Sequence, residues 1–310
     1  MVGDTKTRQA VPFGGVSAVL KGPALKHFVQ TPADLAPAQQ GAGAYPTFTY
    51  HGGPIVTTSI VHASFWGAVW QSDQAHLQRA TRMEQFLQDL LASDYMNILS
   101  QYGAGQGAGR AGAYASKGMI ANVANQLTDA AIQQTLQSAI DSKALPEPGR
   151  PAKDVVMIYL AEGIDVQGPD PARMCEPNGD NAFGYHSSFA TKAGNPFYYS
   201  VIPALDDACL KASCQIDAQC SLHLSLTQEQ RQTQVSSHEY SEMVTDPEGN
   251  AWFDGKSGSE NGDICNGTSA VLQVGTRSWT VQRMYSKHDD VASNGATTCI
   301  TSAPKPIPRI

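Results

Sequence analysis

The segment Ser237–Glu242 combines residue types that could bind a metal ion and activate water. His238 and Glu242 are four residues apart. On a helix, side chains with this spacing lie on one face, one turn apart, so both could bind a single ion. Glu239 follows the histidine directly and could accept a proton from a water molecule bound to that ion. The segment therefore predicts a metal site with His238 and Glu242 as ligands and Glu239 as the catalytic base.

The acids that follow this segment supply candidates for a third ligand. Glu260 lies 18 residues after Glu242, Glu248 lies ten residues after His238, and Asp263 is the third possibility. Asp263 could instead orient the ring of His238 as a hydrogen-bond partner. The pattern has the geometry of the HExxH motif of zinc peptidases, with a glutamate in place of the second histidine. Carboxylate oxygen is an accepted ligand of zinc.

Three protein ligands and one water molecule form an open zinc site, which is typical of catalysis rather than of structure. Such an ion lowers the pKa of its water and polarises a carbonyl group. We therefore expect a zinc-dependent peptidase that hydrolyses peptide or protein substrates. Because the donors are rich in carboxylates, calcium or manganese is the alternative ion.

Three further residues could contact a substrate or stabilise a transition state. His186 lies in a predicted strand, and Tyr285 and His288 follow the last predicted strand. Packing within the fold is the simpler interpretation for each of them.

The six cysteines all lie in the second half of the chain and include no CxxC pair, which disfavours a structural zinc cluster. An even number of cysteines favours disulfides in an oxidising compartment over free thiols in the cytosol. Cysteines that bracket a short loop or a predicted hairpin are the simplest partners, although six cysteines allow fifteen pairings. The expected disulfides are Cys214–Cys220, Cys265–Cys299 and, by elimination, Cys175–Cys209.

Hydrophobic periodicity predicts a single layered domain of the α/β (α+β) class with a mixed sheet. Its candidate site helix begins at the capping box Thr227–Gln230 and ends near Thr245, before Pro247. Residues 1–45 and 301–310 are expected to be loosely ordered, and residues 46–300 to form the domain. The other expected helices are 73–99 and 127–141, and the expected strands are 59–70, 154–161, 183–189, 197–202, 270–274 and 279–285.

The overall composition excludes several classes of protein. The chain of 310 residues is 41% hydrophobic and carries a net charge of -7, with no basic stripe. These values favour a globular core and disfavour nucleic-acid binding. No apolar stretch approaches the roughly 18 residues that a membrane helix needs, so membrane insertion is not expected.

Seven segments, taken in order, resemble the EXORDIUM, or phosphate-induced, protein family and its bacterial relatives. They are Tyr50–Ile55, Ser64–Gly67, Met96–Gly103, Asp207–His223, Ser237–Glu242, Asn250–Phe253 and Glu260–Cys265. The resemblance covers about residues 48 to 300.

This resemblance implies a secreted, extracellular or periplasmic protein, since plant members of the family are associated with the cell wall. The family pattern has a hydrophobic residue at the position of Glu248, which favours Glu260 as the third ligand. Asn261 stands where isoleucine is usual in the family. The alternative to a peptidase is therefore a non-catalytic protein that binds a cell-wall component or a surface partner and holds a structural metal ion.

Overall fold

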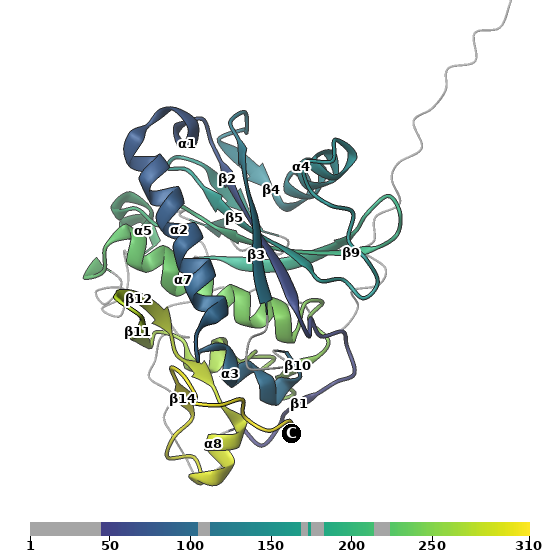
Figure 1. The fold of residues 1–310 in the computed structure, drawn as a ribbon, viewed down its shortest axis with the longest axis vertical. Coiled ribbons are helices and arrows are strands. Elements are labelled where there is room, and N and C mark those ends of the chain that lie inside the picture. The colour runs from purple at the N-terminus through teal and green to yellow at the C-terminus, as the bar shows by residue number, and fades with distance from the viewer. Residues whose placement is uncertain (1–44, 105–111, 169–172, 175–182, 214–223) are drawn as a thin grey trace, which may run out of the picture.

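The computed structural model describes residues 45–104, 112–168, 173–174, 183–213 and 224–310. These residues form a mixed β-sheet with helices on its faces, together with several small sheets (Figure 1). The predicted α/β class with a mixed sheet is confirmed.

The central sheet has five strands in the order β3-β2-β5-β9-β8. They are β3 (Gly112–Ile120), β2 (Ser59–Trp66), β5 (Asp154–Leu160), β9 (Pro196–Ile202) and β8 (Tyr185–Ala190). The first four are parallel, and β8 runs antiparallel to β9 at one edge. Parallel strands covered on both faces are typically near-continuous apolar runs. In β5 the run is uninterrupted after Asp154.

Three long helices cover the sheet: α2 (Gln74–Ala92), α4 (Asp129–Asp141) and α7 (Gln228–Thr245). Each begins at the kind of capping residue that accepts a hydrogen bond from the first turn. Asp73 caps α2, Thr128 caps α4, and Thr227 forms the predicted capping box with Gln230 at the start of α7. The sequence therefore determines these three starts locally.

The helices lie on opposite faces of the sheet. The hydroxyl groups of Tyr159 on β5 and Ser236 on α7 are 3.1 Å apart, so this side of β5 faces α7. Tyr199 on β9 and Tyr185 on β8 instead donate to Asp129 at the start of α4. Because successive strand residues alternate between faces, His186 must face α7. α2 contacts both α7 and the sheet.

Smaller elements complete the fold. β1 (Phe48–Tyr50) pairs with β10 (Trp252–Asp254), and β11 (Ser269–Val274) forms a hairpin with β12 (Arg277–Gln282). Another small sheet contains β4 (Gln126–Thr128), β6 (Asp165–Gln167) and β7 (Arg173–Met174), and β13 (Met284–Tyr285) pairs with β14 (Cys299–Ile300). The short helices are α1 (Val69–Ser72), α3 (Met96–Leu99), η2 (Ser100–Tyr102), α5 (Asp207–Ser213), η3 (Asp263–Cys265) and α8 (Lys287–Ala292).

The structure differs from the sequence patterns in several places. The expected strand 59–70 ends at Trp66 and is followed by helix α1, and the expected helix 73–99 is divided between α2 and α3. β3 was not expected, because its large apolar residues are few and do not alternate regularly. The tail 301–310 is held more closely than its proline-rich composition indicates. Its backbone N–H groups at Ala303 and Ile307 donate to carbonyl groups of Asp94 and Asn97, and so fasten the tail beside α3.

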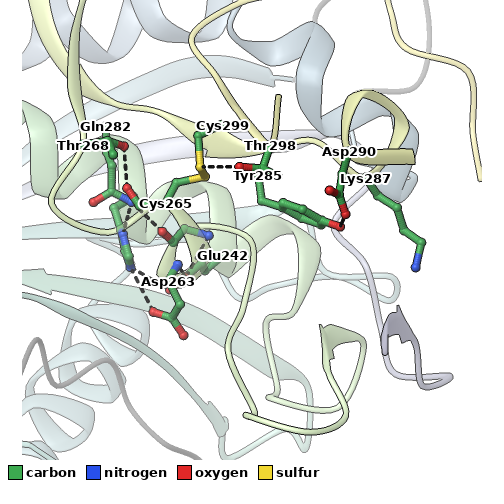
Figure 2. Close-up of a disulfide and its surroundings, with 12 residues drawn as sticks. Glu242, Asp263, Cys265, Thr268, Gln282, Tyr285, Lys287, Asp290, Thr298 and Cys299 are labelled. Atoms are coloured by element: carbon green, nitrogen blue, oxygen red, sulfur yellow. Dashed lines mark hydrogen bonds and ion pairs between the residues drawn. A yellow bond between two sulfur atoms is a disulfide. The ribbon is translucent and has the colours of Figure 1, made fainter. Parts of the chain in front are cut away.

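The disulfide Cys265–Cys299 is present, as predicted, and joins η3 to β14 (Figure 2). Cys209 is also disulfide-bonded. The expected pair Cys214–Cys220 and the expected partner of Cys209, Cys175, lie outside the described residues. Among the described residues, no helix is both long enough and apolar enough to cross a membrane.

We predict that replacing Cys265 and Cys299 together by serine destabilises the protein. The disulfide closes a chain segment with a sequence separation of 34 residues. Losing the cross-link restores entropy to the unfolded chain, worth about 3–4 kcal/mol for a loop of this length. Urea unfolding of the oxidised wild type and the double variant measures the difference. Unfolding of both proteins under reducing conditions is the control, because the difference between them should then disappear, and unchanged stability in the oxidised double variant would contradict the prediction.

A second prediction concerns the attachment of the β11–β12 hairpin to α2. Asp89 accepts two hydrogen bonds from Arg277, at 2.6 and 2.7 Å, and one from the indole of Trp279 at 2.7 Å. Burial opposes the charged form of Asp89, but the bonds from Arg277 and Trp279 outweigh burial and lower its pKa. The stabilisation is therefore present above the unfolded pKa of about 4 and is lost as the pH falls through the folded value.

Asp89→Asn should reduce the free energy of unfolding by about 1 kcal/mol at pH 7, because Arg277 is half exposed and partly hydrated. The difference from wild type should shrink on acidification below pH 3. Urea unfolding of wild type and variant at pH 7 and below pH 3 measures this difference in the free energy of unfolding. In a double-mutant cycle with Arg277→Met, additive losses would show that the two residues do not act as a pair.

Candidate metal centre

Helix α7 is buried around nearly its whole circumference, although its sequence is polar. Every residue from Arg231 to Thr245 is buried. His238, Glu239 and Glu242 are at most 2% exposed. Buried polar groups require partners, and buried charges require pairing or a bound ion. The serines of α7 are satisfied within the helix, since Ser236 and Ser241 donate to carbonyl groups four residues earlier. The ionisable residues need partners from other elements.

Glu242 is held by the backbone of the loop that follows β10. Its Oε1 atom accepts hydrogen bonds from the N–H groups of Gly262 and Asp263, at 3.1 and 3.0 Å. Its Oε2 atom has no hydrogen-bond partner among the described residues. Oε2 lies 3.1 Å from His238 Nε2 and 3.7 Å from His186 Nδ1. One oxygen therefore fixes the side chain, and the other remains available to a ligand.

His186 reaches the same place from β8 and is 8% exposed. Its Nε2 atom lies 3.3 Å from the carbonyl oxygen of Asp246, which can only accept, so Nε2 carries the hydrogen. Nδ1 then presents a lone pair, 3.6 Å from Glu239 Oε2 and 3.7 Å from Glu242 Oε2. Within the described part of the chain, Nδ1 has no hydrogen-bond donor facing it. A histidine that donates one ring N–H to a backbone carbonyl has the arrangement of a metal ligand.

The ring of His238 is fixed by Gln282 at the end of β12. The side-chain nitrogen of Gln282 lies 2.7 Å from His238 Nδ1 and 2.7 Å from the carbonyl oxygen of Gly262. An amide nitrogen has two hydrogens and can donate one to each acceptor. The hydrogen of a neutral His238 ring is therefore on Nε2, where it points toward Glu242 Oε2.

The loop that carries Glu260 and Asp263 can approach α7 because residue 262 is glycine. A Cβ atom on Gly262 would lie 2.7 Å from Glu242 Oε1 and 2.8 Å from His238 Nδ1. Two hydrogen bonds of Asn261 hold the loop in this position. Its side-chain amide donates to the hydroxyl of Thr245, and its backbone carbonyl accepts from the N–H of Tyr285. The Cys265–Cys299 disulfide ties the end of the loop, as Figure 2 shows beside Glu242, Asp263 and Gln282.

Glu260 and Asp263 bring two further carboxylates to the cluster. Glu260 Oε1 lies 3.8 Å from His186 Nε2, and Asp263 Oδ1 lies 3.7 Å from His238 Nε2. Neither oxygen has a hydrogen-bond partner among the described residues, and the same is true of both oxygens of Glu239. No lysine or arginine in the described ranges is within ion-pair distance of these carboxylates or of Glu242. The two histidines are therefore their nearest basic groups.

The pKa values reflect this crowding. Burial raises the pKa of Glu239, and burial together with the charge of Glu242 raises the pKa values of Glu260 and Asp263 well above their usual range. Burial opposes the charged form of His238, but Glu242 outweighs it and raises the histidine pKa to about 10. In the absence of a metal ion, protons therefore compensate part of the negative charge of the cluster.

The possible ligand atoms form two overlapping groups of three. One group contains His186, Glu242 and Glu260, and the other contains His238, Glu239 and Glu242. Within each group, one ligand atom from every residue lies within 4.8 Å of the others. Glu242 belongs to both groups, whereas His238 and Glu260, which the sequence assigned to one ion, belong to different groups.

The structure places the remaining candidates in different surroundings. Glu248 lies past the helix end and accepts a hydrogen bond from Tyr198. Tyr285 donates to Asp290, and the backbone N–H of His288 donates to Gln101. Asp246, which sequence reasoning did not single out, accepts from two backbone N–H groups, and burial raises its pKa to about 6. Its position immediately after the buried helix was the available signal.

The sequence offered His186 either packing within the fold or a possible contact with the substrate, and in the structure its Nδ1 atom faces two carboxylates at the centre of the cluster. Comparisons of the chain with protein-family models, with curated proteins and with solved structures found no match.

Proposed function

We propose that the protein is a secreted, metal-dependent hydrolase, with zinc as the expected ion and peptide bonds as the expected substrate. The observation that carries this proposal is the set of buried donor atoms without hydrogen-bond partners around Glu242. Buried polar groups are normally paired, and an unpaired carboxylate in the interior is costly. A divalent cation would satisfy several of these atoms at once.

The separations between donor atoms support one ion held by His186, Glu242 and Glu260. Tetrahedral zinc with bonds of 2.0–2.2 Å holds its ligand atoms about 3.3–3.6 Å apart. His186 Nδ1 lies 3.7 Å from Glu242 Oε2, close to this value. Glu260 belongs to the same group of possible ligands, and its Oε1 atom lies 3.8 Å from the other ring nitrogen of His186, Nε2. His186 therefore replaces His238 in the ligand set that the sequence predicts, while Glu242 and Glu260 remain.

With three protein ligands, the ion would have room for water and would supply a water molecule of lowered pKa and a polarised carbonyl. Glu239 is the candidate base, because both of its oxygens lack hydrogen-bond partners in the described structure and Oε2 lies 3.6 Å from His186 Nδ1. His238 would orient Glu242 by directing its Nε2 hydrogen toward Oε2. Gln282 holds the ring in that tautomer.

Secretion is supported by the disulfide Cys265–Cys299, since disulfides persist mainly in oxidising compartments. The resemblance to the EXORDIUM family points the same way. The HExxE pattern on α7, close to the zinc-peptidase motif, favours a peptide or protein as the substrate.

One observation favours a second candidate function. All five residues of the two donor groups are at most 8% exposed. Such burial also suits a structural metal ion in a non-catalytic extracellular protein that binds a cell-wall component or a surface partner. The two candidates share the metal and differ in whether Glu239 takes part in a reaction.

We predict that the purified protein binds one zinc ion tightly and that Glu242→Gln lowers its zinc affinity about 100-fold or more, because a ligand charge is lost. His186→Ala should have a similar effect. Elemental analysis after dialysis and competition with a chromophoric chelator measure the affinity. Glu229→Gln, on the same helix but in an ion pair with Arg82, is the matched control. Folded wild-type protein without affinity for zinc, calcium or manganese would refute a metal centre.

We further predict that Glu239→Gln reduces kcat by about 10²–10⁴, because the amide cannot accept the proton of the attacking water. The variant should keep its tightly bound zinc. Cleavage of a mixture of unstructured peptides, followed by mass spectrometry, measures both the rate and the bonds cut. Wild-type protein that binds zinc but cleaves none of the peptides, or a variant as active as wild type, would favour the structural-metal function.

A further inference from the structure

The second group of possible ligands consists of His238, Glu239 and Glu242. The proposed zinc ion uses only Glu242 from this group. We infer that this group is a second, weaker binding position for a divalent cation, and that occupancy of it inhibits hydrolysis by engaging Glu239. This inference rests on the proposed function, because it assigns the second position relative to the first.

The cluster has more possible ligand atoms than one open zinc site uses. Such a site takes three protein atoms and a water molecule. Six buried atoms of the cluster lack hydrogen-bond partners in the described structure: His186 Nδ1, both carboxylate oxygens of Glu239, Glu242 Oε2, Glu260 Oε1 and Asp263 Oδ1. The first ion would bind the atoms that belong to His186, Glu242 and Glu260. The unpaired oxygens of Glu239 and Asp263 would still lack a partner.

The charge of the cluster leads to the same conclusion. Glu239, Glu242, Glu260 and Asp263 are four carboxylates without lysine or arginine at ion-pair distance among the described residues. One divalent cation offsets two of these charges. Because separated charge is costly in a buried site, the remaining carboxylates would attract a second cation or retain protons.

Glu242 can serve both positions through one oxygen. Its Oε2 atom lies 3.1 Å from His238 Nε2 and 3.7 Å from His186 Nδ1, and these histidines belong to different groups. Two cations that share a ligand are usually about 3.5–4 Å apart in hydrolases. The approach of the two histidines to one oxygen suits such a pair.

The second position should be the weaker because His238 is not arranged to bind there. When the ring is neutral, its Nε2 atom carries the hydrogen while Gln282 donates to Nδ1. An ion on Nε2 requires this hydrogen to move to Nδ1, with no net change in the ring protons. The Gln282 amide must then turn its oxygen toward Nδ1, and it loses its hydrogen bond to Gly262.

Inhibition follows from the identity of the second group. Glu239 is the proposed base, and a carboxylate that coordinates a cation accepts a proton poorly. Hydrolysis should therefore rise as the first zinc ion binds and fall as the second one does. The same residue gives a separable test, because Glu239 contributes to the second position and not to the first.

Native mass spectrometry and a zinc titration of the full chain test the inference. Wild-type protein should bind two zinc ions, the second with at least about tenfold weaker affinity, and peptide hydrolysis should decline with the second. Glu239→Gln should keep the first ion and lose the second, whereas Glu229→Gln should keep both. Glu260→Gln should weaken the first ion instead.

The outcomes separate this inference from the proposed function. A single zinc ion at millimolar zinc, a second ion that persists in Glu239→Gln, or a second ion that leaves hydrolysis unchanged would overturn the inference and leave the hydrolase proposal standing. No bound zinc would overturn both. If Glu239→Gln fails to fold, the inference can be tested by electron paramagnetic resonance on wild-type protein loaded with two manganese ions. A magnetically coupled electron paramagnetic resonance spectrum supports the pair, and the six-line spectrum of isolated ions overturns it.

Discussion

The negative charge buried around α7 is the constraint on which the rest of this structure depends. Glu239 and Glu242 are fully buried on a helix that is itself enclosed. Placing carboxylates in such an interior costs several kcal/mol per ion unless they are paired. A fold selected only for stability would fill these positions with apolar side chains. The buried charge therefore has to be compensated within the fold by pairing, by protons or by a bound ion.

The surrounding elements are arranged so that this charge is held in one geometry. β8 contributes His186, the loop after β10 contributes two backbone N–H groups to Glu242, and β12 contributes Gln282. These segments are far apart in the sequence and meet only because the sheet, α7 and the hairpin pack together. Gly262 permits the closest approach, and the disulfide at Cys265 keeps the loop from moving away. These contacts hold Glu242 Oε2 beside both histidines, 3.1 Å from His238 Nε2 and 3.7 Å from His186 Nδ1.

Much of the fold was predictable from local patterns in the sequence. The capping box at Thr227 predicted the start of α7, and the apolar run 154–161 predicted β5. β3 was missed because its strand character comes from pairing with β2 rather than from its own residues. The helical part of the site was also predictable, since the spacing of His238 and Glu242 is a local property. The position of His186 was not, because it depends on the pairing of β8 with β9 and on which face of the sheet α7 covers.

The same distinction explains why the sequence grouped the candidate ligands differently from the structure. Spacing along one helix favours His238 and Glu242 as partners, and they do lie 3.1 Å apart. Whether a histidine can bind an ion depends, however, on which ring nitrogen carries the hydrogen, and a distant residue decides this. Asp246 O accepts from Nε2 of His186 and leaves Nδ1 available, whereas Gln282 donates to Nδ1 of His238 and leaves its hydrogen on Nε2. Two histidines beside one carboxylate thus have different capacities for an ion, and the difference originates in the tertiary structure.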